Sequence, residues 1–379
     1  MNQLRFLTLL AFILIVAACS ATSQPSLKEQ TKSQGFPKQN ETVLIAWWNV
    51  ENLFDTFDDP TDDDEFLPSG RRAWTEERLQ KKITNLSKVI SDLSQSRGKT
   101  LPDVMGFCEV EHQALLERLF EDGLKTKNYR YAYFESGDNR GIDVGIAYDA
   151  SKFTLQSAAK YKVDMGQGER PTRDIIRASL TYKGKTIHYL VNHWPSRLGG
   201  QERSEPKRLL AAAALRKVVD SIYASDPKAD FVIMGDFNDG PENKSITEVM
   251  KASVTHQELA SSTGKPEDIP LFNYAKFYPG NGEVKGTIIF SNQWEFIDLC
   301  LISKGMTDNY GFYAKEDKLD EPYETRAFNI FQRDYLFEAP DANRRGRLKD
   351  LYRTYGSGNK YLGGFADHLP VFIEVYVAP

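Results

Sequence analysis

The sequence predicts an α/β protein whose strands lie in packed sheets, and three observations support this prediction. Short apolar runs rich in β-branched residues alternate along the chain with helix-like segments. Several of the strand-like runs end on acids, amides or histidines. The 379 residues, of which 41% are hydrophobic, are enough for a large core in one big domain or two smaller ones.

The charge balance argues against broad electrostatic binding along a nucleic-acid backbone. The formal net charge is -5 and the pI is about 5.7. The sequence also contains no basic tail or block, which such binding normally uses. A small or locally bound phosphate substrate remains compatible with this composition.

Residues 1–19 are expected to be a lipoprotein signal peptide. Arg5 gives a weakly basic start, and the apolar run from Phe6 to Ala18 is too short to span a bilayer. The run Val16-Ala17-Ala18-Cys19 resembles a bacterial lipobox, which implies cleavage before Cys19 and a lipid on its sulfur. The alternative is an ordinary cleaved signal with a chance cysteine. We therefore expect an exported cell-envelope lipoprotein, periplasmic or outer-membrane-attached, that is membrane-anchored and not membrane-spanning.

The rest of the chain divides into a tether and one large domain. Residues 20–41 are rich in Ser, Thr, Gln and Lys and predict a disordered tether, followed by a domain over 42–379. The polar and aromatic segment 304–364 is interpreted as an insertion or lid within this domain. The expected strands are 43–50, 103–110, 131–134, 144–148, 175–181, 186–191, 231–234, 286–290, 294–302 and 371–377, and the expected helices are 74–93, 114–124 and 205–223.

The strand at 231–234 carries the most informative ending. It is followed by Gly235, Asp236, Phe237 and Asn238, so a rigid support would deliver a carboxylate and a carboxamide out of the core. Asp236 can accept a proton or hold a cation, and Asn238 can orient a water or an oxyanion. The structural alternative is an Asx-rich turn without a site.

Polar residues also lie within other apolar strands or beside their ends. An amide or a charge in such a position is costly unless it is paired or ligates something. If these strand ends converge, their carboxylates and amides form a hard donor set that suits Mg²⁺, Mn²⁺ or Ca²⁺ better than zinc. The sequence has no HExxH or CxxC motif. The residues concerned are Asn49, Glu109, His193, Asp298, Asp367 and His368.

Other charged and reactive groups leave two readings open. Arg140 could bind a phosphate or lie in a surface hairpin loop. For the segment 58–65, a solvated acidic loop is favoured over a structural cation site, because the segment lacks the glycine and ligand spacing of an EF-hand. Cys108 and Cys300 are expected to be small buried hydrophobes, not a disulfide. Two interpretations are also open for six further arginines, which could form a local basic rim or be solvated surface residues. They are Arg170, Arg173, Arg177, Arg197, Arg203 and Arg208.

Six motifs in order resemble the endonuclease/exonuclease/phosphatase superfamily, the group of DNase I, exonuclease III, neutral sphingomyelinases and inositol polyphosphate 5-phosphatases. The resemblance covers 43–377, and the opening 47–55 is similar to predicted bacterial extracellular nucleases. One departure is Ala366, where the family usually has serine. The motifs are Trp48-Asn49-Val50-Glu51-Asn52, Phe107-Cys108-Glu109-Val110, Asn192-His193-Trp194-Pro195-Ser196, Gly235-Asp236-Phe237-Asn238, Ile297-Asp298 and Asp367-His368-Leu369-Pro370.

This resemblance implies a DNase I-like, four-layer sandwich of two facing mixed β-sheets flanked by helices. It also implies metal-dependent phosphoester hydrolysis with Mg²⁺, or Mn²⁺ or Ca²⁺, as the cofactor. By motif, Glu109 is the principal metal ligand, and Asn49 and Asp367 lie near the ion. Asn49 and Arg140 are the expected substrate-binding residues.

The resemblance also implies catalytic roles. Asp236 and Asn238 position or deprotonate the attacking water and bind the phosphate. His368 stabilises or protonates phosphate oxygens, and Asp298 orients this histidine by a hydrogen bond. His193 corresponds to the second histidine of the DNase I and sphingomyelinase branches, where the exonuclease III branch has tyrosine.

We therefore expect a divalent-metal-dependent phosphodiesterase or nuclease that hydrolyses nucleic acid by attack of water on phosphorus. One alternative is a lipid, sugar or inositol phosphate phosphoesterase, either sphingomyelinase-like or a phosphatase. Another is a non-catalytic surface-binding lipoprotein on the same scaffold, because a fold alone does not secure a function. That last alternative predicts the loss of pocket residues, and none is missing. No protein partner is evident.

Overall fold

A computed structural model describes residues 41–339 and 348–379. The expected signal peptide, Cys19 and residues 20–40 of the expected tether lie outside the described residues, as do residues 340–347. Glu41, expected at the end of the tether, instead begins the first strand. In the described part of the chain, no helix combines the length and apolar character needed to cross a bilayer.

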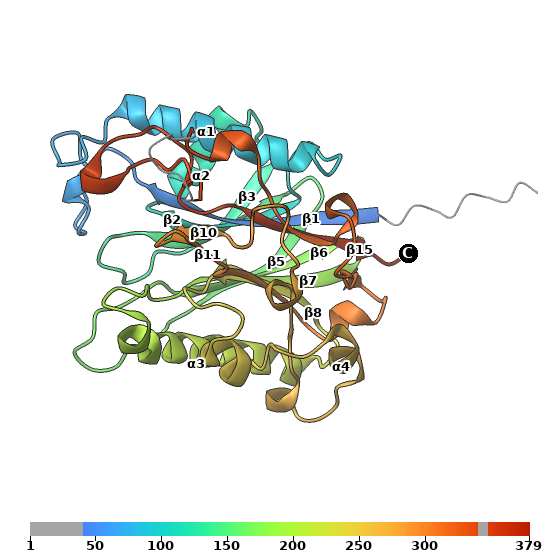
Figure 1. Ribbon diagram of the computed structural model, residues 1–379. Coiled ribbons are helices and arrows are strands. Elements are labelled where there is room, and N and C mark those ends of the chain that lie inside the picture. The colour runs from blue at the N-terminus through green and yellow to red at the C-terminus, as the bar shows by residue number, and fades with distance from the viewer. Residues whose placement is uncertain (1–40, 340–347) are drawn as a thin grey trace, which may run out of the picture. The chain divides into compact units, whose positions relative to one another are not determined.

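Two β-sheets face each other, and helices cover their outer sides (Figure 1). Helices α1 (Glu76–Gln95) and α2 (Gln113–Arg118) lie on one side, and α3 (Gln201–Ser225) and α4 (His256–Ser261) lie on the other. Each sheet contains both parallel and antiparallel pairs. The DNase I-like four-layer fold predicted from the sequence is therefore confirmed.

The first sheet, called sheet A, is centred on β1, which pairs in parallel with β2 and antiparallel with β15. β14 also pairs with β15 at the opposite side from β1. In spatial order sheet A contains β13 (Phe312–Ala314), β15 (Val371–Val377), β1 (Glu41–Leu53), β2 (Val104–Val110), β4 (Asp143–Asp149) and β3 (Tyr129–Tyr133), with β14 (Phe328–Ile330) beside β15.

The second sheet, called sheet B, is centred on β7 and β8, which pair in parallel. A separate short hairpin of β10 (Ile288–Phe290) and β11 (Gln293–Glu295) precedes β12. In spatial order sheet B contains β5 (Thr154–Tyr161), β6 (Ile175–Tyr182), β7 (Lys185–His193), β8 (Asp230–Asp236), β12 (Asp298–Ile302) and β9 (Phe272–Asn273).

Strand β8 is buried on both faces, which explains its continuous apolar run. Val232 and Met234 belong to the core between the sheets, whereas Phe231 and Ile233 pack in the core that includes α3. Successive side chains of a strand point to opposite faces, so one short sequence serves both cores. This two-sided packing makes β8 a rigid support for Asp236 at its end.

Helix α1 places an apolar stripe against sheet A. Thr75 caps its first turn, as its hydroxyl accepts a hydrogen bond from the backbone N–H of Arg78. Leu79, Ile83 and Leu86 are fully buried on the inner side. Helical spacing of three and four residues brings these side chains onto one face.

Some elements differ from the sequence prediction. Strand β5 was not predicted, because this edge strand is largely exposed and polar and lacks an apolar face. Helix α3 begins at Gln201, four residues before the predicted start at Glu205. The segment 304–364, expected as an insertion or lid, contributes β13 and β14 to sheet A. Cys108 and Cys300 are buried and free, as predicted.

Candidate active site

The strand register of sheet B places three predicted site residues side by side. His193 at the end of β7 lies directly opposite Asp236 at the end of β8. Asp236 in turn lies opposite Asp298, the first residue of β12. All three are buried. One edge of sheet B therefore presents a histidine and two carboxylates in a row.

Sheet A supplies Asn49 and Glu109 from the adjacent strands β1 and β2. The register between β2 and β4 shifts at Glu109, whose φ is 61°, so this residue forms a β-bulge. The bulge changes the direction of the Glu109 side chain from the one that regular alternation along the strand would give. The Asn49 Nδ2 group lies 3.4 Å from Glu109 Oε1 and donates to Asp236 Oδ2 at 3.1 Å. The amide of Asn49 thus bridges the two sheets.

His368, three residues before β15, also reaches the sheet B carboxylates. Its Nδ1 lies 2.7 Å from Asp298 Oδ2, as the expected orienting hydrogen bond requires. Its Nε2 lies 3.8 Å from Asp236 Oδ2, and the Nε2 of His193 lies 3.5 Å from the same oxygen. Asp236 is therefore flanked by two imidazoles. The second oxygen of Asp298 accepts a hydrogen bond from the indole N–H of Trp47 at 2.9 Å.

The surroundings of the two histidines shift their pKa values in opposite directions. Burial lowers the pKa of His193 well below its ordinary value, and the charges of Arg173 and Arg140 lower it further. Burial also acts to lower the pKa of His368, but the charge and hydrogen bond of Asp298 outweigh it and raise that pKa well above the ordinary value. His193 is thus neutral at pH 7, and His368 is a cation.

Asp236 lies between these two rings with a pKa raised to about 7. Burial is the main cause, the charge of Asp298 adds to it, and His368 opposes it. A carboxylate with a pKa near neutral is suited to accept a proton from water. Because the surroundings shift the pKa values of Asp236, His368 and His193 apart, these groups are suited to acid and base roles.

Asn238 is held in a strained backbone conformation beside Asp236. Its φ is 49°, and its N–H donates to Asp236 Oδ1 at 2.9 Å. Its Nδ2 donates to the carbonyl oxygen of Trp194 at 3.0 Å. Strained residues of this kind persist where the surroundings fix them, and they gather at functional sites. Glu51 and Asn52, on the facing strand β1, also have positive φ values, of 55° and 54°.

Asp367 lies within electrostatic reach of a buried pair formed by Lys82 and Glu51. The Lys82 Nζ lies 3.8 Å from Glu51 Oε2, and both side chains are almost fully buried. Burial raises the pKa of Glu51 to about 7, with Lys82 opposing and Asp367 adding to the shift. Of the expected metal ligands, Asn49 and Glu109 come from the adjacent strands β1 and β2, and Asp367 lies in the segment that precedes β15. Their role remains a prediction.

Two of the six arginines of the possible local basic rim, Arg208 and Arg173, are buried and paired. Arg208 is fully buried, with its Nε 2.6 Å from Asp239 Oδ1, and so cannot meet a substrate. Arg173 pairs with Asp138 at 3.0 Å and donates to the Trp194 carbonyl.

Arg140 and the remaining arginines of this group are more exposed, and some of them are paired. Arg140 is half-exposed, 3.6 Å from Asp138. Arg197 pairs with Glu295, and Arg177 lies over the ring of Tyr161. Arg170 and Arg203 are exposed.

Sequence reasoning missed several residues that position the site. Thr287 is fully buried; its hydroxyl accepts from Asp298 N–H, and its carbonyl accepts from Leu369 N–H, so it ties β12 to the His368 segment. Nothing in the sequence around Thr287 signals this role. Lys82 could have been found, because it lies between Leu79 and Leu86 on the apolar stripe of α1.

The donor set at this edge fits a hard divalent cation. Of Asp236, Asp298 and His368, whose side-chain atoms lie within 4.8 Å of one another, the two carboxylates offer ligand oxygens, whereas the protonated His368 ring offers no lone pair. Glu109 and Asn49 adjoin them through the Asn49 amide. Carboxylate and amide oxygens are the ligands that Mg²⁺, Mn²⁺ and Ca²⁺ prefer.

A family model described as the Endonuclease/Exonuclease/phosphatase family matches residues 44–377. The chain belongs to this family. The match covers nearly all of the described residues and includes every strand end of the candidate site. The family resemblance found in the sequence motifs is thus confirmed. Among proteins with curated functions, none matches this sequence significantly.

Solved structures of the endonuclease/exonuclease/phosphatase family share the fold. A mannosyl-6-phosphatase from Bacteroides thetaiotaomicron aligns with a TM-score of 0.53 at 13% identity, over 88% of this chain and 99% of that one. D. rerio TDP2 complexed with a single-strand DNA product gives 0.51 at 13%, over 89% and 100%. A family protein from B. thetaiotaomicron gives 0.52 at 15%, over 89% and 98%. These likenesses show that the chain shares their fold.

Proposed function

We propose that the protein is a divalent-metal-dependent phosphodiesterase that hydrolyses nucleic acid by attack of water on phosphorus. The observation that carries the proposal is the position of Asp236, a buried carboxylate with a pKa of about 7, between a neutral His193 and a cationic His368. In this arrangement Asp236 can act as a general base, and the histidines can stabilise charge on the same reacting group.

Each group has a role in this proposal. Asp236 accepts a proton from the attacking water, and the backbone N–H of Asn238 fixes its carboxylate. His368, oriented by Asp298, offers its Nε2–H to the phosphate oxygens as negative charge develops. His193 binds the same phosphate as a neutral donor.

A divalent cation would be held by Glu109 with Asn49 and Asp367. When bound, such an ion neutralises phosphate charge and acts as a Lewis acid. The carboxylate of Glu109 is already fixed for this role, because its Oε2 accepts the backbone N–H of Asn52 at 2.9 Å.

The paired arginines favour a phosphodiester over a phosphomonoester. Arg173 and Arg140 share the carboxylate of Asp138, and Arg197 pairs with Glu295, so these three arginines keep a net charge of only one. A diester carries one negative charge, whereas a monoester approaches two near neutral pH and needs more compensation. The TDP2 structure with its single-strand DNA product shows that this fold accommodates such a strand in that protein.

The proposal is tested with bis-p-nitrophenyl phosphate, single-stranded and plasmid DNA, sphingomyelin and a sugar 6-phosphate. We expect hydrolysis of the diester and of DNA with Mg²⁺ or Mn²⁺, loss of activity with EDTA, and loss in Glu109→Gln. Preferential release of phosphate from the sugar phosphate would instead indicate a phosphatase. An absence of turnover on all substrates, with folded protein and added metal, would support the non-catalytic binding role and refute the enzyme.

We also propose that Cys19 carries a lipid and holds the enzyme at the cell envelope. The support is the lipobox-like run that ends at this cysteine. Cys19→Ala should abolish incorporation of labelled palmitate and release the protein from the membrane fraction. Unchanged labelling in this variant would refute the proposal.

A further inference from the structure

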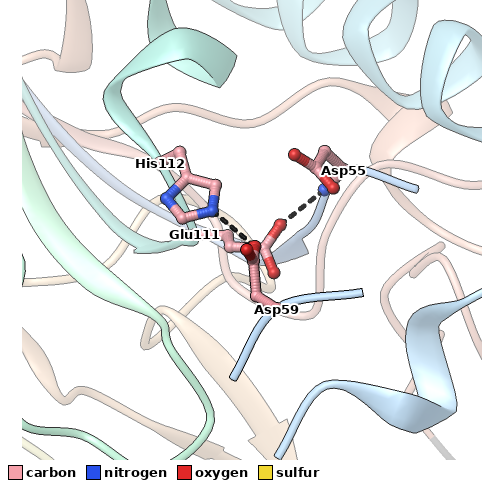
Figure 2. Close-up of side chains that lie close together, drawn as sticks. All are labelled: Asp55, Asp59, Glu111 and His112. Atoms are coloured by element: carbon pink, nitrogen blue, oxygen red, sulfur yellow. Dashed lines mark hydrogen bonds and ion pairs between the residues drawn. The ribbon is translucent and has the colours of Figure 1, made fainter. Parts of the chain in front are cut away.

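A second group of acids and a histidine lies beside the candidate active site. Asp55 and Asp59 come from the loop after β1, and Glu111 and His112 follow the end of β2. Each of the four offers one ligand atom, and these atoms all lie within 4.8 Å of one another. Figure 2 shows the His112 ring and the Asp59 and Glu111 carboxylates facing one another.

One atom in this group lacks any partner. Glu111 is only 1% exposed, and its Oε2 accepts the backbone N–H of Asp55 at 2.7 Å. Its Oε1 is buried and has no hydrogen-bond partner. A buried carboxylate oxygen without a donor is costly, and native proteins normally satisfy it. The position of this atom within a ring of other ligands points to a bound cation.

Most of the negative charge of the group is also uncompensated. In the described part of the chain, no lysine or arginine forms an ion pair with Asp55, Asp59 or Glu111, and the only cationic partner of these carboxylates is His112, at 2.7 Å from Asp59 Oδ2. A divalent ion would replace that contact and neutralise two charges. Asp59 and His112 keep 30% and 32% of their side chains exposed, which gives an ion access to the buried Glu111.

We propose that Asp55, Asp59, Glu111 and His112 form a second metal site that binds a divalent transition-metal ion of the Zn²⁺ or Mn²⁺ type. Three carboxylates and one imidazole make a mixed oxygen and nitrogen set. The imidazole suits Zn²⁺ and the carboxylates suit Mn²⁺, whereas Mg²⁺ and Ca²⁺ take oxygen ligands. The Glu135 carboxylate lies 3.3 Å from His112 Nδ1, on the side of the ring away from Asp59. Such a carboxylate is the usual partner of a metal-binding histidine.

This second site has a structural role, because it joins segments that flank the active site. Glu111 lies two residues after Glu109, and its N–H donates to the carbonyl of Leu53. The acidic loop also bonds to the loop that carries Arg140, through Asp62 N–H and the Asn139 carbonyl at 2.6 Å. An ion bound by Asp55 and Asp59 would fasten this loop to the end of β2.

The test separates this ion from a catalytic one by using the Glu109→Gln background. Metal-free protein is titrated with Zn²⁺, Mn²⁺, Ca²⁺ and Mg²⁺ by calorimetry, and melting temperatures are recorded for each. Glu109→Gln should still bind one Zn²⁺ or Mn²⁺ and melt at a higher temperature with it. Adding Glu111→Gln should remove this ion and the shift, whereas adding Glu117→Gln, a nearby acid outside the group, should leave both unchanged.

A second variant, His112→Gln, keeps the test decisive if Glu111→Gln does not fold. His112→Gln alters a partly exposed side chain and should weaken Zn²⁺ binding about tenfold or more. Anomalous scattering at the zinc edge should place the ion among the four side chains. The proposal is overturned if Glu109→Gln binds no further ion, if Glu111→Gln and His112→Gln bind it as tightly as their parent, or if Ca²⁺ or Mg²⁺ binds more tightly than Zn²⁺ and Mn²⁺.

Discussion

Asp298 contacts His368 through one carboxylate oxygen, at 2.7 Å from Nδ1, and Trp47 through the other. The carboxylate therefore fixes both the orientation and the positive charge of the imidazole. We expect Asp298→Asn to lower kcat by roughly 10²-fold or more, because an amide supports the imidazolium poorly.

The control for this variant is Trp47→Phe. It removes the indole donor but leaves Asp298 facing His368, so its loss of kcat should be much smaller. Equal losses in the two variants, measured with bis-p-nitrophenyl phosphate, would show that Asp298 acts mainly through packing.

Each histidine beside Asp236 should be essential for turnover. We expect His193→Ala and His368→Ala each to lower kcat by about 10²–10⁴-fold. Because both rings serve one reacting group, the double variant should lose less than the product of the two single losses. Single-turnover assays provide the rates, and circular dichroism checks the fold. Retained turnover in either folded single variant would contradict the assigned site.

The buried pair of Lys82 and Glu51 should support stability more than chemistry. Lys82→Met removes the cation 3.8 Å from Glu51 Oε2 and also the donor to Thr354 Oγ1. Leaving a buried carboxylate unpaired should cost about 3–5 kcal/mol in the free energy of unfolding. Denaturant titration measures this loss.

A neutral partner should reverse part of that loss. The double variant Lys82→Met/Glu51→Gln removes the unpaired charge and should be more stable than Lys82→Met alone. A double variant less stable than the single one would mean that Glu51 is not the group that Lys82 neutralises.

Asp230 should make stability depend on pH. It is 9% exposed, and burial raises its pKa to about 8, although the N–H of Phe312 donates to it at 2.7 Å. The unfolded chain loses this proton near pH ~4, whereas the folded chain keeps it until about pH 8. The free energy of unfolding should therefore fall as pH rises between these values, by about 1.4 kcal/mol per pH unit from this group alone.

Asp230→Asn should remove that contribution, because an amide imitates the protonated acid. The difference in unfolding free energy between variant and parent should be small at pH ~4 and should grow in favour of the variant towards pH ~8. Urea titrations at several pH values measure it. A difference that stays constant across this range would show that Asp230 is ionised in the folded protein.

The sequence was most informative where strands end in polar groups. His193, Asp236 and Asp298 were predicted from three separate runs, and the register places them opposite one another on adjacent strands. Site residues at strand ends can be predicted because an apolar run that stops at a histidine or acid is unusual. The order of strands in a sheet depends on distant pairings, so the direct contact of Asn49 with Asp236 could not be derived locally.

Other features escaped prediction for identifiable reasons. Arg208 looks like a solvated helix residue, but its partner Asp239 lies in a distant part of the chain and draws it into the interior. The acidic loop was favoured as solvated because its own residues lack a ligand pattern. Its likeness to a metal site emerges only when Glu111 and His112, which follow the end of β2, are brought beside Asp59.

The pairing of β15 with β1 has a consequence for when the protein can act. The indole N–H of Trp48 donates to the carbonyl of His368, a residue 320 positions later in the chain. Contacts of such long sequence separation form late in folding. A growing polypeptide therefore cannot complete the candidate active site until β15 has been made and paired with β1, so synthesis itself delays the assembly of the site.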